Sequence, residues 1–138
     1  MVNTIDMEDM RHLNLFGKIT QVGTRFCFNY NEMIVFCVPK QLISKAVGEN
    51  GRNVKQISEI LRRKIKIIPQ PQGIHHARDF IQTIVSPVTF KNLEIRDNEM
   101  VLTAGSQSKA ALLGRNKRRL LEMQKIVRDF FGKEFRII

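Results

Sequence analysis

Gly48 and Gly51 separate two segments whose apolar residues recur at the spacing of an α-helix. These apolar positions are Leu42, Ile43, Ala46 and Val47 before the glycines, and Val54, Ile57, Ile60 and Leu61 after them. Glycine lets the backbone turn sharply and approach another backbone closely. The second helix then begins with N–H groups that have no partner inside the helix, and such an end attracts phosphate. The spacing therefore predicts two helices joined by a glycine turn, with the start of the second helix favouring an anionic ligand.

The net charge of +10 is concentrated in two blocks of the 138-residue chain. Residues 39–66 hold eight basic and two acidic side chains, and residues 114–138 hold eight basic and three acidic ones. The rest of the chain is close to neutral. Concentrated positive charge is typical of proteins that bind a polyanion. Because neither basic segment carries the bulky aromatic face of a membrane-surface helix, we expect nucleic acid as the partner and no membrane.

The chain partly matches itself when it is shifted by sixty-six residues. Val47-Gly48 aligns with Leu113-Gly114, Asn50 with Asn116, and Arg52 with Arg118. After an insertion of one helical turn, residues 65–68 align with residues 135–138. The elements keep the same order in both copies, which predicts a duplicated structural unit.

Each copy is predicted to contain a helix, two strands, two helices and a closing strand. In the first copy we expect a leading helix from near Asp6 to Gly17, a hairpin of residues 26–29 and 33–38, and a closing strand at residues 64–68. Residues 69–73 are rich in proline and glycine and mark a boundary. The predicted domains are therefore residues 1–70 and 71–138.

In the second copy, Pro87 is expected to end the leading helix. Strands follow at residues 88–95 and 99–103, with a bulge between Phe90 and Leu93 where the apolar phase slips. A short helix at residues 108–113, a long helix and a closing strand at residues 135–138 complete the copy. The predicted fold class is α+β, with two three-stranded sheets that are each covered on one face by helices.

This order of elements around a G-x-x-G turn resembles the type II KH fold, a nucleic-acid-binding module. Two such units in a chain of this length look like the archaeal NusA-like transcription factors. The resemblance extends from Met7-Glu8-Asp9-Met10 to Ile138. It implies tandem type II KH domains, binding to single-stranded RNA, and a non-catalytic role in transcription elongation or termination. Direct contact with RNA polymerase is left open.

Carried over residue by residue, the resemblance implies an RNA-binding site in the first unit. Gly48 and Gly51 would be the motif glycines, with Glu49 and Asn50 at the variable positions. The nearby cations would contact phosphate; they are Lys45, Arg52 and Lys55. Val47 and Val54 would line the groove and the core beneath it. Glu49 is unfavourable next to phosphate, unless its carboxylate points away.

The second unit departs from the motif, because Gly114-Arg115-Asn116-Lys117 has lysine at the place of the second glycine. Either this turn opens differently and Lys117 binds a phosphate directly, or the unit binds weakly. The cations around it are expected to make general electrostatic contact with RNA; they are Arg115, Lys117, Arg118 and Arg119.

Two other functions remain open from the residues alone. A KH protein of ribosome assembly would share every feature described above. An enzyme acting on nucleotides is disfavoured, because the Gly48–Ser58 segment lacks the Gly-Lys-Ser/Thr ending of a P-loop and no nucleophile–base grouping is evident. We therefore expect no catalysis and no cofactor.

The cysteine and histidine residues do not form a recognisable metal motif. Because no Cys-x-x-Cys or His-x-x-x-His accompanies them, no metal site is predicted. His12, His75 and His76 are expected at the surface or its boundary. Cys27 and Cys37 are expected as reduced core thiols in adjacent strands, although the spacing leaves a disulfide between them open. The lack of a signal peptide or a membrane-length apolar run predicts a cytoplasmic protein, which we expect to be a monomer.

Overall fold

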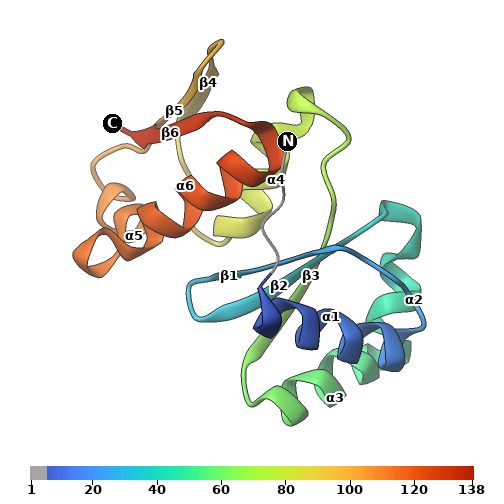
Figure 1. The fold of residues 1–138 in the computed structure, drawn as a ribbon. Helices are drawn as coiled ribbons and strands as arrows, with labels where there is room; N and C mark the ends of the chain where they lie inside the picture. The colour runs from blue at the N-terminus through green and yellow to red at the C-terminus, as the bar shows by residue number, and fades with distance from the viewer. Residues whose placement is uncertain (1–5) are drawn as a thin grey trace. The chain divides into compact units, whose positions relative to one another are not determined.

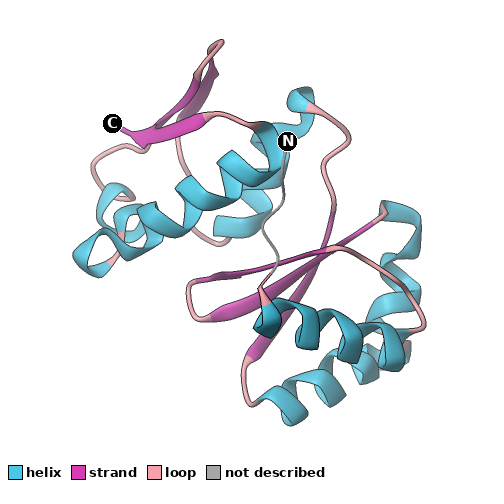
Figure 2. Ribbon diagram, viewed as in Figure 1, coloured by secondary structure: helices cyan, strands magenta, loops and turns pink. Residues whose placement is uncertain are grey.

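The computed structural model describes residues 6–138, which divide into two compact units, residues 6–70 and Pro71–Ile138 (Figure 1). Each unit contains, in order, a leading helix, two strands, a short helix, a longer helix and a strand (Figure 2). The protein is therefore an α+β protein with two three-stranded sheets. Among residues 6–138, no helix combines the length and the apolar character that crossing a bilayer requires.

The sheet of the first unit has strand β2 at its centre. Strand β1 (Phe26–Tyr30) pairs antiparallel with β2 (Met33–Val38), and β3 (Lys64–Pro69) pairs parallel with β2. The helices of this unit are α1 (Met7–Thr20), α2 (Ile43–Val47) and α3 (Arg52–Leu61). The parallel return of β3 requires a crossover, which α2 and α3 supply.

A two-residue turn joins β1 to β2. Asn31 and Glu32 both have positive φ, at 51° and 63°, which is the backbone that twisted two-residue hairpins require. Arg63, which follows α3, reaches this hairpin. Its Nε donates to the carbonyl oxygen of Glu32 at 3.2 Å, and its Nη2 donates to Oδ1 of Asn29 at 3.0 Å. These two hydrogen bonds connect the C-terminal end of α3 to the β1–β2 hairpin.

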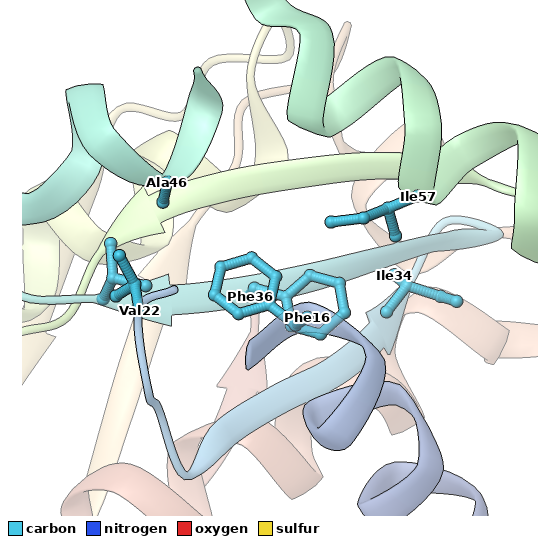
Figure 3. Packing of buried hydrophobic residues seen from close by; sticks show 7 residues of the cluster. Phe16, Val22, Ile34, Phe36, Ala46 and Ile57 are labelled. Carbon is cyan, nitrogen blue, oxygen red and sulfur yellow. The ribbon is translucent and has the colours of Figure 1, made fainter. Parts of the chain in front are cut away.

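All three helices of the first unit contribute to one core on one face of the sheet (Figure 3). The rings of Phe16 from α1 and Phe36 from β2 are stacked, with centroids 4.4 Å apart and planes inclined by 16°. Ala46 of α2 and Ile57 of α3 are fully buried in the same cluster. Alternate residues of β2 face these helices because side chains of a strand point to opposite faces in turn.

The second unit repeats this topology. Strand β4 (Asn92–Ile95) pairs antiparallel with β5 (Glu99–Thr103), and β6 (Glu134–Ile137) pairs parallel with β5. Its helices are α4 (Ala77–Val85), α5 (Lys109–Leu113) and α6 (Arg118–Phe131). Phe80 of α4 packs on Phe130 of α6, with ring centroids 4.9 Å apart. Lys133 takes the role of Arg63, since its Nζ donates to the carbonyl oxygens of Arg96 at 2.8 Å and Asp97 at 2.7 Å.

The prediction that the leading helix ends by Gly17 is wrong. Helix α1 continues to Thr20 and ends at Gln21, which adopts the left-handed conformation. The hydroxyl of Thr20 donates to the carbonyl oxygen of Phe16 at 2.7 Å and accepts from the N–H of Val22 at 3.0 Å. These bonds satisfy backbone groups at the helix end, so the last turn persists beyond the glycine.

The prediction of a bulged strand at residues 88–95 is also wrong. Strand β4 begins only at Asn92, and its register with β5 is unbroken from Asn92–Thr103 to Ile95–Met100. The apolar slip therefore lies in the segment before the strand, where Phe90 is buried. In α3, Ile60 is 53% exposed and does not belong to the core, although its spacing suggested that it would.

Candidate nucleic-acid interface

The turn between α2 and α3 requires glycine at position 48 for two reasons. Gly48 has φ 81° and ψ 165°, a conformation that residues with a side chain essentially do not adopt. A Cβ atom placed there would also lie 2.9 Å from Cγ of Asn53. The N–H of Gly48 donates to the carbonyl oxygen of Ser44 at 3.0 Å and ends α2. Helix α3 consequently starts close against the end of α2.

The next residues of the turn are left-handed. Asn50 has φ 55° and ψ 25°, and Gly51 has φ 71° and ψ 21°. The N–H of Gly51 donates to the carbonyl oxygen of Gly48 at 3.0 Å, which closes the turn. Among residues 6–138, and apart from the two chain neighbours of Gly51, no atom lies within 4 Å of a Cβ placed on Gly51, so this side of the turn is open. Asparagine is one of the few residues with a side chain that tolerates this backbone, which accounts for Asn50.

Asn53 holds the two helices together, a role that the sequence patterns did not reveal. Its Nδ2 donates to the carbonyl oxygens of Ala46 at 3.1 Å and Lys45 at 3.3 Å. These carbonyls belong to the last turn of α2, where no further helical N–H can reach them. An asparagine in the first turn of the second helix was the available signal for such a bond.

The first turn is surrounded by positive charge. Lys45, Arg52 and Lys55 are exposed, and within residues 6–138 none of them forms an ion pair. The N-terminus of α3 has no side-chain cap, whereas Asp6 caps α1 by accepting from the N–H of Asp9 at 2.8 Å. The N–H of Arg52 donates to the carbonyl oxygen of Glu49, and the partial positive charge of the α3 N-terminus adds to the charge of the nearby cations.

The backbone of the second turn follows the same path. Gly114 has φ 75° and ψ 171°, Asn116 has φ 56° and ψ 28°, and Lys117 has φ 60° and ψ 26°. The N–H of Lys117 donates to the carbonyl oxygen of Gly114 at 3.1 Å, as Gly51 does to Gly48. The alternative in which lysine makes this turn open differently is therefore wrong.

The second turn differs in its side chains. Arg119 occupies the place of Asn53, and its guanidinium pairs with Glu122 of the same helix. The Arg119 side chain is only 13% exposed. Arg115, Lys117 and Arg118 are exposed, and no ion pair involves them among the described residues. Of the four cations predicted here, three face solvent and one is engaged within α6.

The two cysteines are not joined in a disulfide and lie on opposite faces of the first sheet. Cys27 is paired in register with Phe36, and Cys37 with Phe26, so the two side chains cannot meet in a disulfide. Burial, with a further contribution from Cys27, raises the pKa of the Cys37 thiol above its usual range. The Cys37 thiol therefore stays protonated and unreactive in the folded protein.

One histidine prediction is wrong: His12 is buried, with 8% of its surface exposed. It lies on α1 beside Asp9 of the same helix and Cys27 of β1. His75 is exposed, and His76 is half-buried, where its Nδ1 accepts from the N–H of Gln72 at 3.2 Å. The grouping of Asp9, His12 and Cys27 escaped the sequence patterns because its members come from different elements.

The chain is similar in sequence to known proteins over part of its length. No protein-family model matches the chain. It is 27% identical over 100 residues to the "Probable transcription termination protein NusA" of Methanococcus vannielii, covering 71% of this chain and 56% of that protein. It is 24% identical over 95 residues to the protein of the same name from Halococcus morrhuae, covering 69% and 66%. The matched region is thus less than two thirds of either relative's length.

A solved structure shares the fold along nearly the whole chain. The crystal structure of APE1850 superposes with a TM-score of 0.64 at 22% sequence identity, covering 97% of this chain and 99% of that one. The likeness establishes the arrangement of helices and strands. The protein is thus a distant sequence relative of archaeal proteins named NusA, and it has a fold that is already known from a crystal structure.

Proposed function

We propose that this protein is a non-catalytic, NusA-like factor that binds single-stranded RNA during transcription elongation or termination. Each unit would then be a type II KH domain. The order of elements, the parallel return of the last strand and the glycine turn between a short and a long helix support the proposal. The distant relatives named as probable transcription termination proteins support the connection to transcription.

The observation that carries the proposal is the open, positively charged turn at Gly48–Gly51. Two backbone segments approach closely there, and in the described part of the chain no atom beyond the neighbours of Gly51 lies within 4 Å of the place where its Cβ would be. The N-terminus of α3 has no side-chain cap, and Lys45, Arg52 and Lys55 are exposed cations that form no ion pair among residues 6–138. The exposed carboxylate of Glu49 in the turn partly opposes their charge. A sugar–phosphate backbone fits such a turn because its charge is compensated while its bases stay accessible to the adjoining surface.

In this proposal the second unit binds RNA less selectively. Its turn has the same backbone, but the side chain of Lys117 stands where Gly51 leaves open space. Arg115, Lys117 and Arg118 would still attract phosphate from several directions. The first unit would therefore hold the strand in a defined path, and the second would add charge-driven affinity.

The direct test is the double variant Glu49→Asp/Asn50→Asp in the full chain. Both positions are exposed, and aspartate tolerates the left-handed backbone of residue 50, so the fold should persist. The new carboxylate would repel phosphate where α3 now attracts it. We expect affinity for short single-stranded RNA to fall by about tenfold or more, which corresponds to the loss of one charge-assisted contact. Fluorescence anisotropy measures this change.

Asn31→Asp is the matched control. Asn31 is also an exposed left-handed asparagine, and it lies in the β1–β2 turn, so the variant has the same change of charge. It should bind RNA almost as well as the parent chain. Equal weakening by both variants would contradict a site at the glycine turn.

The transcription role needs a separate experiment, because RNA binding alone does not distinguish it from ribosome assembly. Crosslinking in cells, followed by sequencing of the bound RNA, should recover nascent transcripts of many genes. Precursor ribosomal RNA as the dominant partner would retain the RNA-binding site but replace the transcription role.

A further inference from the structure

Helix α1 and strand β1 bring three potential metal ligands together in the first unit. A carboxylate oxygen of Asp9, an imidazole nitrogen of His12 and the Sγ atom of Cys27 all lie within 4.8 Å of one another. Asp9 and His12 are buried, and Cys27 is half-buried. The spacing of three residues places the aspartate and the histidine on one face of α1, where β1 packs.

The imidazole of His12 is not satisfied by the protein. Within residues 6–138, its Nδ1 is the buried side-chain nitrogen or oxygen that makes no hydrogen bond. Its Nε2 lies 3.9 Å from Oε1 of Glu8, whose side chain is 68% exposed. Nε2 therefore has an acidic neighbour at the surface, whereas the buried Nδ1 has no hydrogen-bond partner. A buried nitrogen without a partner is rare in folded proteins, and a bound ion is one of the explanations for it.

The acidic residues at the start of α1 can be explained without a metal ion. That explanation does not extend to the histidine and the cysteine of the cluster. Glu8 and Asp9 lie in the first turn, where negative charge complements the helix dipole. That effect does not explain why a histidine is buried beside them, or why a thiol from another element completes the group. The Cys27 thiol also donates a weak hydrogen bond to the carbonyl oxygen of Asp9, with Sγ and oxygen 3.8 Å apart, but the burial of His12 with an unsatisfied Nδ1 is what metal coordination would explain.

We propose that Asp9, His12 and Cys27 bind a divalent transition-metal ion of the zinc type. Oxygen, nitrogen and sulfur donors together match the ligand preferences of Zn²⁺. Nδ1 of His12 would coordinate the ion, and Glu8 would accept from Nε2, an arrangement that orients histidine at many metal sites. The thiol of Cys27 releases its proton to solvent as the metal–sulfur bond forms. Water fills the fourth position.

The separation of the three donors allows such a site after a small adjustment. Ligand atoms around a tetrahedral Zn²⁺ are about 3.3–3.7 Å apart, given metal–ligand distances of about 2.0–2.3 Å. The donors, which are up to 4.8 Å apart, must therefore draw in by roughly 1 Å. The bound ion would fix α1 to β1. This proposal does not depend on RNA binding, because neither element carries the glycine turn.

Cobalt titration of the reduced, metal-free full chain tests the site. Co²⁺ should bind in a one-to-one ratio and produce the thiolate-to-cobalt absorption and strong d–d bands of a tetrahedral ion. Zn²⁺ should displace it and raise the midpoint of thermal unfolding. Cys27→Ser should abolish the thiolate band, whereas Cys37→Ser should keep it, because Cys37 lies on the opposite face of the sheet.

The role of His12 in metal binding is tested against a control variant at another histidine. His12→Gln should weaken Zn²⁺ binding by more than about tenfold, the scale on which even outer partners of ligands act. His75→Gln, at an exposed histidine, should leave the affinity unchanged. Alkylation of the unmodified chain gives a readout that needs no variant: Zn²⁺ should protect Cys27, as identified by peptide mass spectrometry. Absence of a thiolate band, or equal alkylation of Cys27 with and without Zn²⁺, would overturn the proposal.

Discussion

Lys117 holds a backbone conformation that disfavours an amino acid with a side chain. Its φ of 60° and ψ of 26° nearly equal those of Gly51 in the first unit, at 71° and 21°. A residue with a Cβ atom loses about 1 kcal/mol in this region relative to glycine. Since Lys117 is exposed, core packing does not account for its presence. The strained lysine is consistent with a role at the surface of the turn.

Lys117→Gly should stabilise the second unit by up to about 1 kcal/mol, because the backbone strain is removed. The reciprocal variant Gly51→Lys should destabilise the first unit by a similar amount. No atom within 4 Å obstructs a Cβ at position 51, so its cost comes from the backbone alone. Urea denaturation of the full chain measures both changes.

RNA binding by the same two variants addresses the role of the side chain. If lysine blocks a close approach of RNA, Lys117→Gly should bind more tightly and Gly51→Lys more weakly. Weaker binding by both variants would instead show that Lys117 contacts phosphate and that the open space at Gly51 is also needed.

At the level of elements, the junction of α2 and α3 depends on one side chain. Asn53 bonds two carbonyl oxygens at the end of α2, and its side chain fills the space against Gly48. These contacts fix the angle between the two helices, and with it the position of the N-terminus of α3. The second unit has Arg119 at this place, and its guanidinium pairs with Glu122 of the same helix.

Asn53→Ala should lower the stability of the first unit by about 1–2 kcal/mol, because two carbonyls lose their donor. RNA affinity should fall as well, since the helices can then change their angle. Gln56→Ala, an exposed change on the same helix, serves as the control and should be nearly neutral in both measurements. Unchanged RNA affinity in Asn53→Ala would show that the turn keeps its shape without this bridge.

The order of the elements was predictable because apolar periodicity and glycine or proline residues report local structure. The residues at which helices and strands begin or end were harder to predict, because they depend on hydrogen bonds that form only in the folded structure. Gly17 looked like the end of α1, but the hydroxyl of Thr20 prolongs the helix. The segment before Asn92 looked like a strand, but only residues from Asn92 onward enter the ladder with β5.

The candidate sites also differ in how far the sequence alone reveals them. The glycine turn is local, so its spacing and charges are visible in the sequence. Asn53 escaped notice because a hydrogen bond to an earlier helix leaves no periodic pattern. The cluster of Asp9, His12 and Cys27 joins a helix to a strand, so no spacing along the sequence brings its three members together.

Across the whole molecule, the two blocks of positive charge coincide with the two glycine turns and the helices that follow them. Exposed cations outside these blocks are scattered over other elements. If both turns contact phosphate, affinity should depend on the number of cations at the turns more than on net charge. Counterion release then gives a steep salt dependence.

The triple variant Arg115→Ala/Lys117→Ala/Arg118→Ala should reduce the slope of log affinity against log salt by up to about 2, at about 0.7 per phosphate of a single strand. The control removes the same charge elsewhere, through Arg11→Ala/Lys18→Ala/Lys91→Ala, three exposed positions outside the blocks. Its slope should stay near that of the parent chain. Equal losses in the two variants would indicate diffuse attraction without a defined path for RNA.

The placement of β3 has a consequence for how the protein is made. This strand ends at Pro69 and completes the sheet of the first unit from within that unit. During translation, every residue of that sheet has therefore been synthesised before residues 71–138, and domains generally fold as units in the order of their synthesis. The first glycine turn can therefore form while later residues of the nascent chain are still being added.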